Sequence, residues 1–250
     1  MTESGQYIYA IAAIQEEKHF GPIGIGGEGS DVSTVCYQDI GAVLSPSPVK
    51  EYPITRANTL AHQKVMETVM ADYPMLPVRF GTIAEGLEMI REKVLKDRYK
   101  ELKDLLQYHR DKVELGLKAL WPQMEAVFNE IIEENREIKR LKQRLMSGRG
   151  GTQRDQVKLG EMVKKALETK KGREERELLQ NLKGLSVEHK TNRVFGDQMI
   201  TNSAFLVKKE QEKAFDQAVD TLSHRYNGRM KLKYVGPVPP CNFVEIVVRW

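Results

Sequence analysis

Short apolar runs typical of β-strands lie at both ends of this chain, and a long charged region typical of helices separates them. The first run, residues 7–14, is almost wholly apolar and predicts a strand that is buried on both faces. The last run, residues 243–248, predicts a strand at the end of the chain. Sheets and helices that are segregated in this way indicate an α+β fold.

The first part of the chain predicts one small sheet followed by helices. Residues 32–37 and 40–44 are further strand-type runs, separated by glycine and aspartate. Thr55 is a good N-cap, and the apolar residues after it recur every four positions at Ala61, Val65 and Val69. Pro74 ends this helix because proline disfavours helical geometry at the residue before it. Two more helices are expected, one from about residue 84 and one over 98–108.

From Val113 onward the predicted order is strand, helices, strand or loop, strand, helix and strand. That order resembles a βαββαβ unit, the ferredoxin-like arrangement, with an enlarged helical region at 122–184 after its first strand. We therefore expect two domains, an N-terminal α+β domain at 1–108 and a modified ferredoxin-like α+β domain at 109–250.

The enlarged region predicts two helices. One begins at Pro122, where the missing N–H costs nothing, and runs to about residue 146. The other spans about 155–183 and is weakened by Gly160 and Gly172. Because few apolar residues lie between Lys164 and Glu177, we expect that stretch to be mobile.

The charge of the helical region raises the question of nucleic acid. Residues 133–183 contain fifteen Lys/Arg and nine Asp/Glu, whereas the whole chain has a net charge of +4. Nucleic-acid readers place aromatic side chains among basic ones to stack bases, and residues 136–183 contain no Phe, Tyr or Trp. The interleaved charges therefore favour a solvated helix pair.

No motif in the chain predicts a catalytic, cofactor or metal site. Residues 24–29 match GxGxxG, but the β-prone sequence after them lacks the helix that a dinucleotide needs, so we interpret them as a hairpin loop. The five histidines never pair at metal-ligand spacing, and His62 is interpreted as a surface or partly packed residue. The two cysteines, Cys36 and Cys241, are interpreted as small apolar fillers. A Ser/His/Asp triad stays open because its members need not be neighbours, although no GxSxG signature argues for one.

Arg79 is the most informative single charge, because it lies within an apolar strand-type run. An arginine there can clamp a ligand carboxylate or tie the sheet to a helix through Glu85 or Glu88. We favour the structural role, since buried charges are usually paired.

Targeting signals are also missing from the sequence. No run approaches the roughly 20 apolar residues of a membrane span, and the N-terminus lacks the build of a signal peptide. These features predict a cytoplasmic protein that has no membrane partner.

Several blocks in series resemble the GvpL/GvpF family of gas vesicle proteins. The matching blocks are residues 7–11, 40–45, His62 with the helix that follows it, 76–82, 113–117, 202–207 and 235–244. Two positions depart from the family pattern, because Val238 stands where an aromatic residue is usual and Cys241 where tyrosine is usual.

The resemblance implies two α+β domains, no catalysis, no cofactor and association with gas vesicles in the cytoplasm. It also implies a role in building or lining the vesicle shell through contact with the small hydrophobic major shell protein (GvpA-like), and with other gas vesicle accessory proteins. Our hypothesis places the partner-binding surface at Gly236, Pro237, Pro239, Pro240 and Phe243. Two alternatives remain: a small-molecule enzyme on a ferredoxin-like scaffold that uses Arg79 or Glu114, and a nucleic-acid-binding module that uses the basic helices 133–183.

Overall fold

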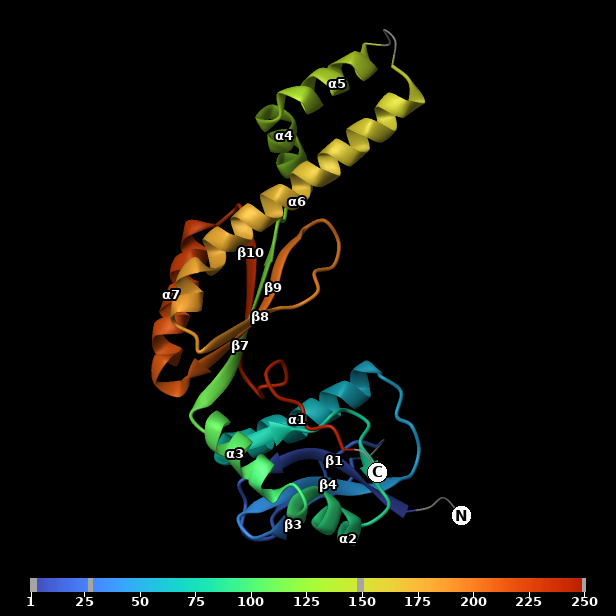
Figure 1. Cartoon of the computed structure of the whole chain (residues 1–250), viewed down its shortest axis with the longest axis vertical. Coiled ribbons are helices and arrows are strands. Elements are labelled where there is room, and N and C mark those ends of the chain that lie inside the picture. The colour runs from blue at the N-terminus through green and yellow to red at the C-terminus, as the bar shows by residue number, and fades with distance from the viewer. Residues whose placement is uncertain (1–3, 27–28, 148–150, 249–250) are drawn as a thin grey trace. The chain divides into compact units, whose positions relative to one another are not determined.

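The computed structural model describes residues 4–26, 29–147 and 151–248, and the chain divides into two compact units (Figure 1). The first unit consists of Met1–Glu114 together with Pro237–Trp250, and the second is Leu115–Gly236. The division therefore differs from the expected one at residue 108, because the end of the chain belongs to the first unit.

The first unit is built on a six-stranded sheet with the order β2-β3-β4-β1-β5, in which β6 also pairs with β1. Its strands are β1 (Ser4–Ala12), β2 (His19–Gly21), β3 (Val32–Tyr37), β4 (Ile40–Pro48), β5 (Met75–Pro77) and β6 (Ile83–Ala84). β1 pairs antiparallel with β4 on one side and with β5 on the other. Tyr7 to Ala12 are fully buried, as expected for a strand that is covered on both faces.

Helices cover both faces of this sheet. The helix α1 (Arg56–Asp72) begins at Thr55, whose hydroxyl accepts a hydrogen bond from the Asn58 amide, and it packs over Tyr7 and Tyr9. The opposite face, which includes Ile8, is covered by the π-helix η1 (Ile90–Lys96), entered through the short α2 (Leu87–Met89), and by α3 (Tyr99–His109).

The last described residues complete this unit. Ile246 forms a parallel bridge with Val78, with its amide donating to the Pro77 carbonyl at 2.8 Å. The prediction of a strand over residues 243–248 is therefore wrong in extent, because the described part of this segment forms only this one bridge. Ile246 is nevertheless buried in the apolar core, which explains why the tail belongs to the first unit.

The second unit contains a four-stranded sheet with the order β10-β7-β9-β8. Its strands are β7 (Lys112–Leu120), β8 (Glu188–Thr191), β9 (Met199–Lys208) and β10 (Lys231–Val238). The short η2 (Lys209–Gln211) leads into α7 (Glu212–Arg225), which contacts the long α6 (Gln153–Gly184). Figure 1 shows both helices beside the sheet, and Phe215 of α7 packs on Phe205 of β9.

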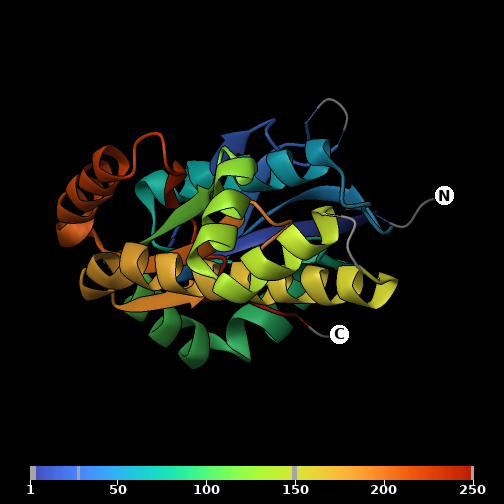
Figure 2. The ribbon, with the colours of Figure 1, turned by 90° about the horizontal axis from the view of Figure 1, so that it is seen from above.

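The helical region differs from its prediction in two respects. The first expected helix is broken at Asn135 into α4 (Met124–Glu134) and α5 (Arg136–Met146), because Asn135 has an extended backbone and its side-chain amide donates to the Ile131 carbonyl. The second is one continuous helix through both glycines (Figures 1 and 2). The stretch that was expected to be mobile instead buries Lys170, Lys171 and Glu174, so ion pairs and hydrogen bonds replace the missing apolar contacts.

Candidate functional site

The proposed partner-binding residues follow one another along the end of β10 and the turn after it. Gly236 and Pro237 are exposed, whereas Pro239 and Pro240 are buried and Phe243 is half-buried. The two buried prolines therefore support the turn from within, and the accessible part of the predicted set is the end of the strand.

Glu114 fixes this turn. This residue is 4% exposed, and its carboxylate accepts hydrogen bonds from the backbone amide of Asn242, at 2.8 Å, and from the Asn242 side chain. A carboxylate that is held in this way serves as a structural acceptor for the turn.

Arg79 is exposed and does not pair with Glu85 or Glu88 as expected. It forms a two-nitrogen contact with Glu245, with Nη2 2.9 Å from the carboxylate, so it ties β5 to the tail. It also lies at a hollow of about 450 Å³ whose other walls include Phe80 and Val248. An exposed and paired arginine of this kind is a structural tie between the sheet and the chain end.

β10 is an edge strand of the second sheet, with Val235 on its surface. The Val235 side chain is 57% exposed, and Gly116 on β7 leaves room for it, because a Cβ at Gly116 would lie 2.9 Å from a Val235 methyl group. The Tyr234 hydroxyl donates to Asp216 of α7 at 2.6 Å, and burial raises the pKa of Tyr234 so that this donor stays protonated. Tyr234 thus binds β10 to α7, whereas its neighbour Val235 is apolar and exposed. Sequence reasoning found the alternation of β10 but did not single out Val235.

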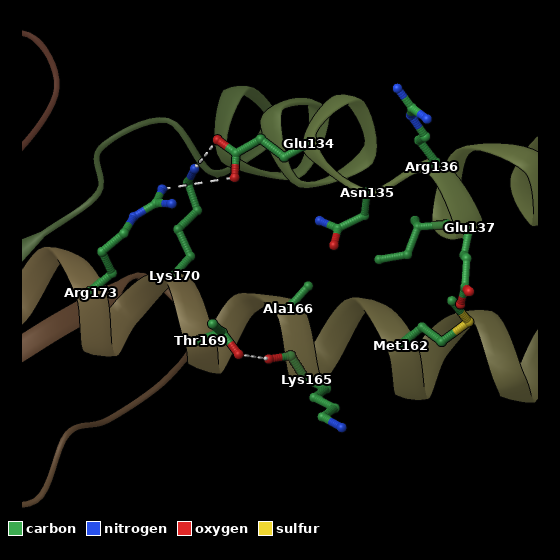
Figure 3. A pocket seen from close by; sticks show the side chains of 11 residues that line it. Glu134, Asn135, Arg136, Glu137, Met162, Lys165, Ala166, Thr169, Lys170 and Arg173 are labelled. Carbon is green, nitrogen blue, oxygen red and sulfur yellow. Dashed lines mark hydrogen bonds and ion pairs between the residues drawn. The ribbon is translucent and has the colours of Figure 1, made fainter.

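A groove of about 720 Å³ lies between the α4–α5 corner and α6 (Figure 3). Its apolar lining consists of Ile138 of α5 and of Met162 and Ala166 of α6. Figure 3 shows Lys170 and Arg173 reaching from α6 to Glu134, with Lys170 Nζ 2.8 Å from the carboxylate. Sequence reasoning missed this groove because the helix break that creates it was not foreseen, although an asparagine within a helical pattern was a usable signal.

An ionic cluster with buried and partly exposed members lies beside the groove. Lys170 is 4% exposed and pairs with Glu130 as well as Glu134, and Glu130 also accepts from Arg229. Arg229 in turn pairs with Glu174, which is buried. The cluster therefore ties α4, α6 and the segment after α7 together.

The other predicted features take structural places. His62 is buried, contrary to its interpretation as a surface or partly packed residue, and burial lowers its pKa to about 4. Cys36 is half-buried, whereas Cys241 is exposed and so is not the buried filler that was expected. Gly24, Gly26 and Gly29 precede β3 rather than a helix, and residues 27–28 of that motif lie outside the described residues. Within the described ranges, no group of three or more His, Cys, Asp or Glu residues gathers as a metal site, and no helix is long and apolar enough to cross a membrane.

Comparison with known proteins decides the family. The family model described as "Gas vesicle synthesis protein GvpL/GvpF" matches residues 5–245. The chain belongs to the GvpL/GvpF family.

Relatives in this family align with nearly the whole chain. Gas vesicle protein F of Streptomyces sp. (strain CB03234) is 28% identical over 240 residues, which cover 96% of this chain and 99% of that protein. Gas vesicle protein F1 of Halobacterium salinarum is 27% identical, with 98% and 95% covered. The crystal structure of the gas vesicle protein GvpF from Anabaena sp. PCC7120 has the same mixed fold of helices and sheets, with a TM-score of 0.82, 24% identity and coverage of 97% of this chain and 99% of that one.

Proposed function

We propose that this member of the GvpL/GvpF family is a non-enzymatic accessory protein of gas vesicle assembly that binds the small hydrophobic shell subunit. The observation that carries the proposal is the family match over residues 5–245, together with relatives that are named as gas vesicle proteins along almost their entire length. We accordingly place the chain in the cytoplasm, in association with gas vesicles.

The open edge of β10 is our proposed contact for the shell subunit. A subunit that assembles into a shell exposes apolar surface beforehand, and an accessory protein has to cover that surface. An edge strand offers unpaired backbone groups to an incoming strand, and neighbouring side chains supply selectivity. Exposed Val235, Gly236 and Pro237 lie at this edge, and the turn after them, with Phe243, is held by Glu114.

We also propose that the second unit is a modified ferredoxin-like fold with its enlarged helical region after the first strand. The order β10-β7-β9-β8 supports this class, as does the placement of α6 before β8 and of α7 between β9 and β10.

The substitution Val235→Asp should reduce binding of the shell subunit about tenfold, because it places an unpaired carboxylate in an apolar contact. The measurement is co-purification of a tagged shell subunit that is co-expressed with the full-length chain. Val187→Asp is the matched control, since Val187 is 44% exposed and precedes β8 at the other edge of the same sheet.

Equal loss of binding in both variants would show that the β10 edge has no special role, and loss in Val187→Asp alone would move the contact to β8. The functional proposal has its own test, which is removal of this one gene from a gas vesicle gene cluster. Cells that still form normal numbers of buoyant vesicles without it would contradict an assembly role.

A further inference from the structure

The positive charge of this protein is concentrated in one helical hairpin. Residues 136–165, which we call the basic hairpin, contain ten Lys/Arg and three Asp/Glu, a balance of +7. The remainder of the chain then has 29 Lys/Arg and 32 Asp/Glu, a balance of −3. The basic hairpin comprises α5 and the part of α6 that runs beside it (Figure 2).

Among the residues that the structure describes, some cations of the basic hairpin form ion pairs and others do not. Lys139 pairs with Glu133 and Arg144 pairs with Asp155. Arg136, Arg140 and Lys165 are exposed and form no ion pair with any residue that the structure describes. Like charges that are left unpaired on one surface create a field that attracts an oppositely charged partner.

Apolar surface accompanies these charges. The groove described above is lined by Met162 and Ala166 of α6, which are partly exposed, and by Ile138 of α5, which is buried; Figure 3 shows Arg136 and Lys165 pointing away from the groove in opposite directions. Toward the tip of the hairpin, Met146 is 77% exposed and Val157 is 58% exposed. A partner that is both acidic and apolar therefore matches this surface better than a purely anionic one.

We propose that the basic hairpin binds an acidic, amphipathic segment of another protein. Apolar side chains of that segment lie against the apolar lining of the groove, and its carboxylates approach Arg136, Arg140 and Lys165. Nucleic acid fits less well, because residues 136–183 lack aromatic side chains for base stacking. This surface is distinct from the β10 edge, so a result that contradicts one of the two proposals leaves the other unaffected.

The test uses the full-length chain and three fluorescent probes of equal charge. One is a peptide with glutamates on one helical face and leucines on the other, the second replaces the leucines with serines, and the third is a single-stranded oligonucleotide. We expect the leucine peptide to bind at least about tenfold more tightly than either of the other probes. The triple variant Arg136→Glu, Arg140→Glu, Lys165→Glu should weaken its binding about tenfold or more.

Matched variants separate the surface from net charge. The triple variant Lys64→Glu, Lys100→Glu, Lys213→Glu changes three exposed lysines elsewhere, and like the first it takes the formal net charge from +4 to −2 (three changes of −2 each), yet its binding should stay within about threefold of the unchanged protein. Ala166→Leu fills the groove and should abolish the preference for leucine over serine, whereas Ala71→Leu on α1 should preserve it. Circular dichroism establishes that each variant is folded.

Three results would overturn the proposal. Equal binding of the leucine and serine peptides would leave only unspecific attraction, and tighter binding of the oligonucleotide would make the hairpin a nucleic-acid surface. Equal weakening by the two triple variants would show that the location of the cations does not matter.

Discussion

Replacing Glu174 with alanine should lower the free energy of unfolding of the second unit by about 3–5 kcal/mol, because it removes the buried carboxylate that pairs with Arg229 and with the Trp121 indole. Glu174 is 7% exposed and accepts hydrogen bonds from the Trp121 indole and from Arg229, both at 2.6 Å. Without it, a fully buried indole N–H loses its acceptor and Arg229 loses one of its carboxylates. Urea unfolding followed by Trp121 fluorescence measures the loss, in a background that carries Trp250→Phe so that one tryptophan reports.

Two further variants provide reference values for this loss in the free energy of unfolding. Glu133→Ala breaks the exposed pair with Lys139 and should cost no more than about 0.5 kcal/mol. Glu174→Gln keeps an acceptor for the indole but loses the charge, so it should fall between the two. If Glu174→Ala destabilised the protein as little as Glu133→Ala does, the cluster would not be what holds α6 to the rest of the second unit.

The second large effect is a loss of stability in acid that depends on His62. The imidazole is buried beneath α1, where Nδ1 lies 3.0 Å from the Tyr7 hydroxyl and the ring is hydrogen-bonded to the backbone of Val78. The Tyr7 hydroxyl also accepts from the Gly81 amide at 2.9 Å. Burial lowers the pKa of His62 from 6.5 to about 4, so the native protein holds this side chain neutral.

The sign of the pH dependence follows from where the proton binds. Between pH 6.5 and about 4 the unfolded chain takes up a proton at His62 and the native protein does not, so the stability falls as the pH falls. The contribution is complete above pH 6.5, and about 3 kcal/mol is lost by pH 4, since one pKa unit corresponds to about 1.4 kcal/mol. Urea unfolding at a series of pH values, followed by circular dichroism, should show this slope.

The matched variants are His62→Asn and His224→Asn. The first removes the titrating group while retaining a polar atom near Tyr7, so this part of the slope should disappear even though the protein is less stable at neutral pH. His224 is exposed on α7, and its replacement should leave the slope intact. A slope of the same size in His62→Asn would assign the acid sensitivity to other groups.

Local signals in the sequence predicted much of the fold. Thr55 and Pro74 mark the ends of α1 to within a residue or two, and the apolar run at 7–14 identified the fully buried β1. The stripe along α1 was less well predicted, since its buried positions are His62, Val65, Met66 and Val69. Hydrophobic patterns treat histidine as polar. The burial of His62 follows instead from its aromatic neighbours Tyr7 and Phe80, which only the fold brings close to it.

The features that sequence reasoning missed depend on residues that are far apart in the chain. The charges of α6 were interpreted as a solvated face because their partners are distant in sequence. Lys170 of this helix pairs with Glu130, and Glu174 pairs with Arg229. Of the residues predicted to bind a partner, Gly236 and Pro237 are exposed and Pro239 is buried, and this burial depends on the fold of the first unit. Arg79 was expected to pair with Glu85 or Glu88, but its partner is Glu245, which is separated from it by 166 residues.

The bridge between Ile246 and Val78 has a consequence for how the protein is made. The first unit is formed by two segments that flank the second unit in sequence, so the segment that supplies Ile246 is synthesised after the whole of the second unit. Until then the outer side of β5 is bare, and a bare strand edge readily pairs with neighbouring chains. Residues 115–236 are synthesised before that segment, so the second unit can fold while the first unit is still incomplete. A chain truncated before Ile246 would therefore keep the whole second unit and yet be prone to aggregate through the uncovered edge of β5.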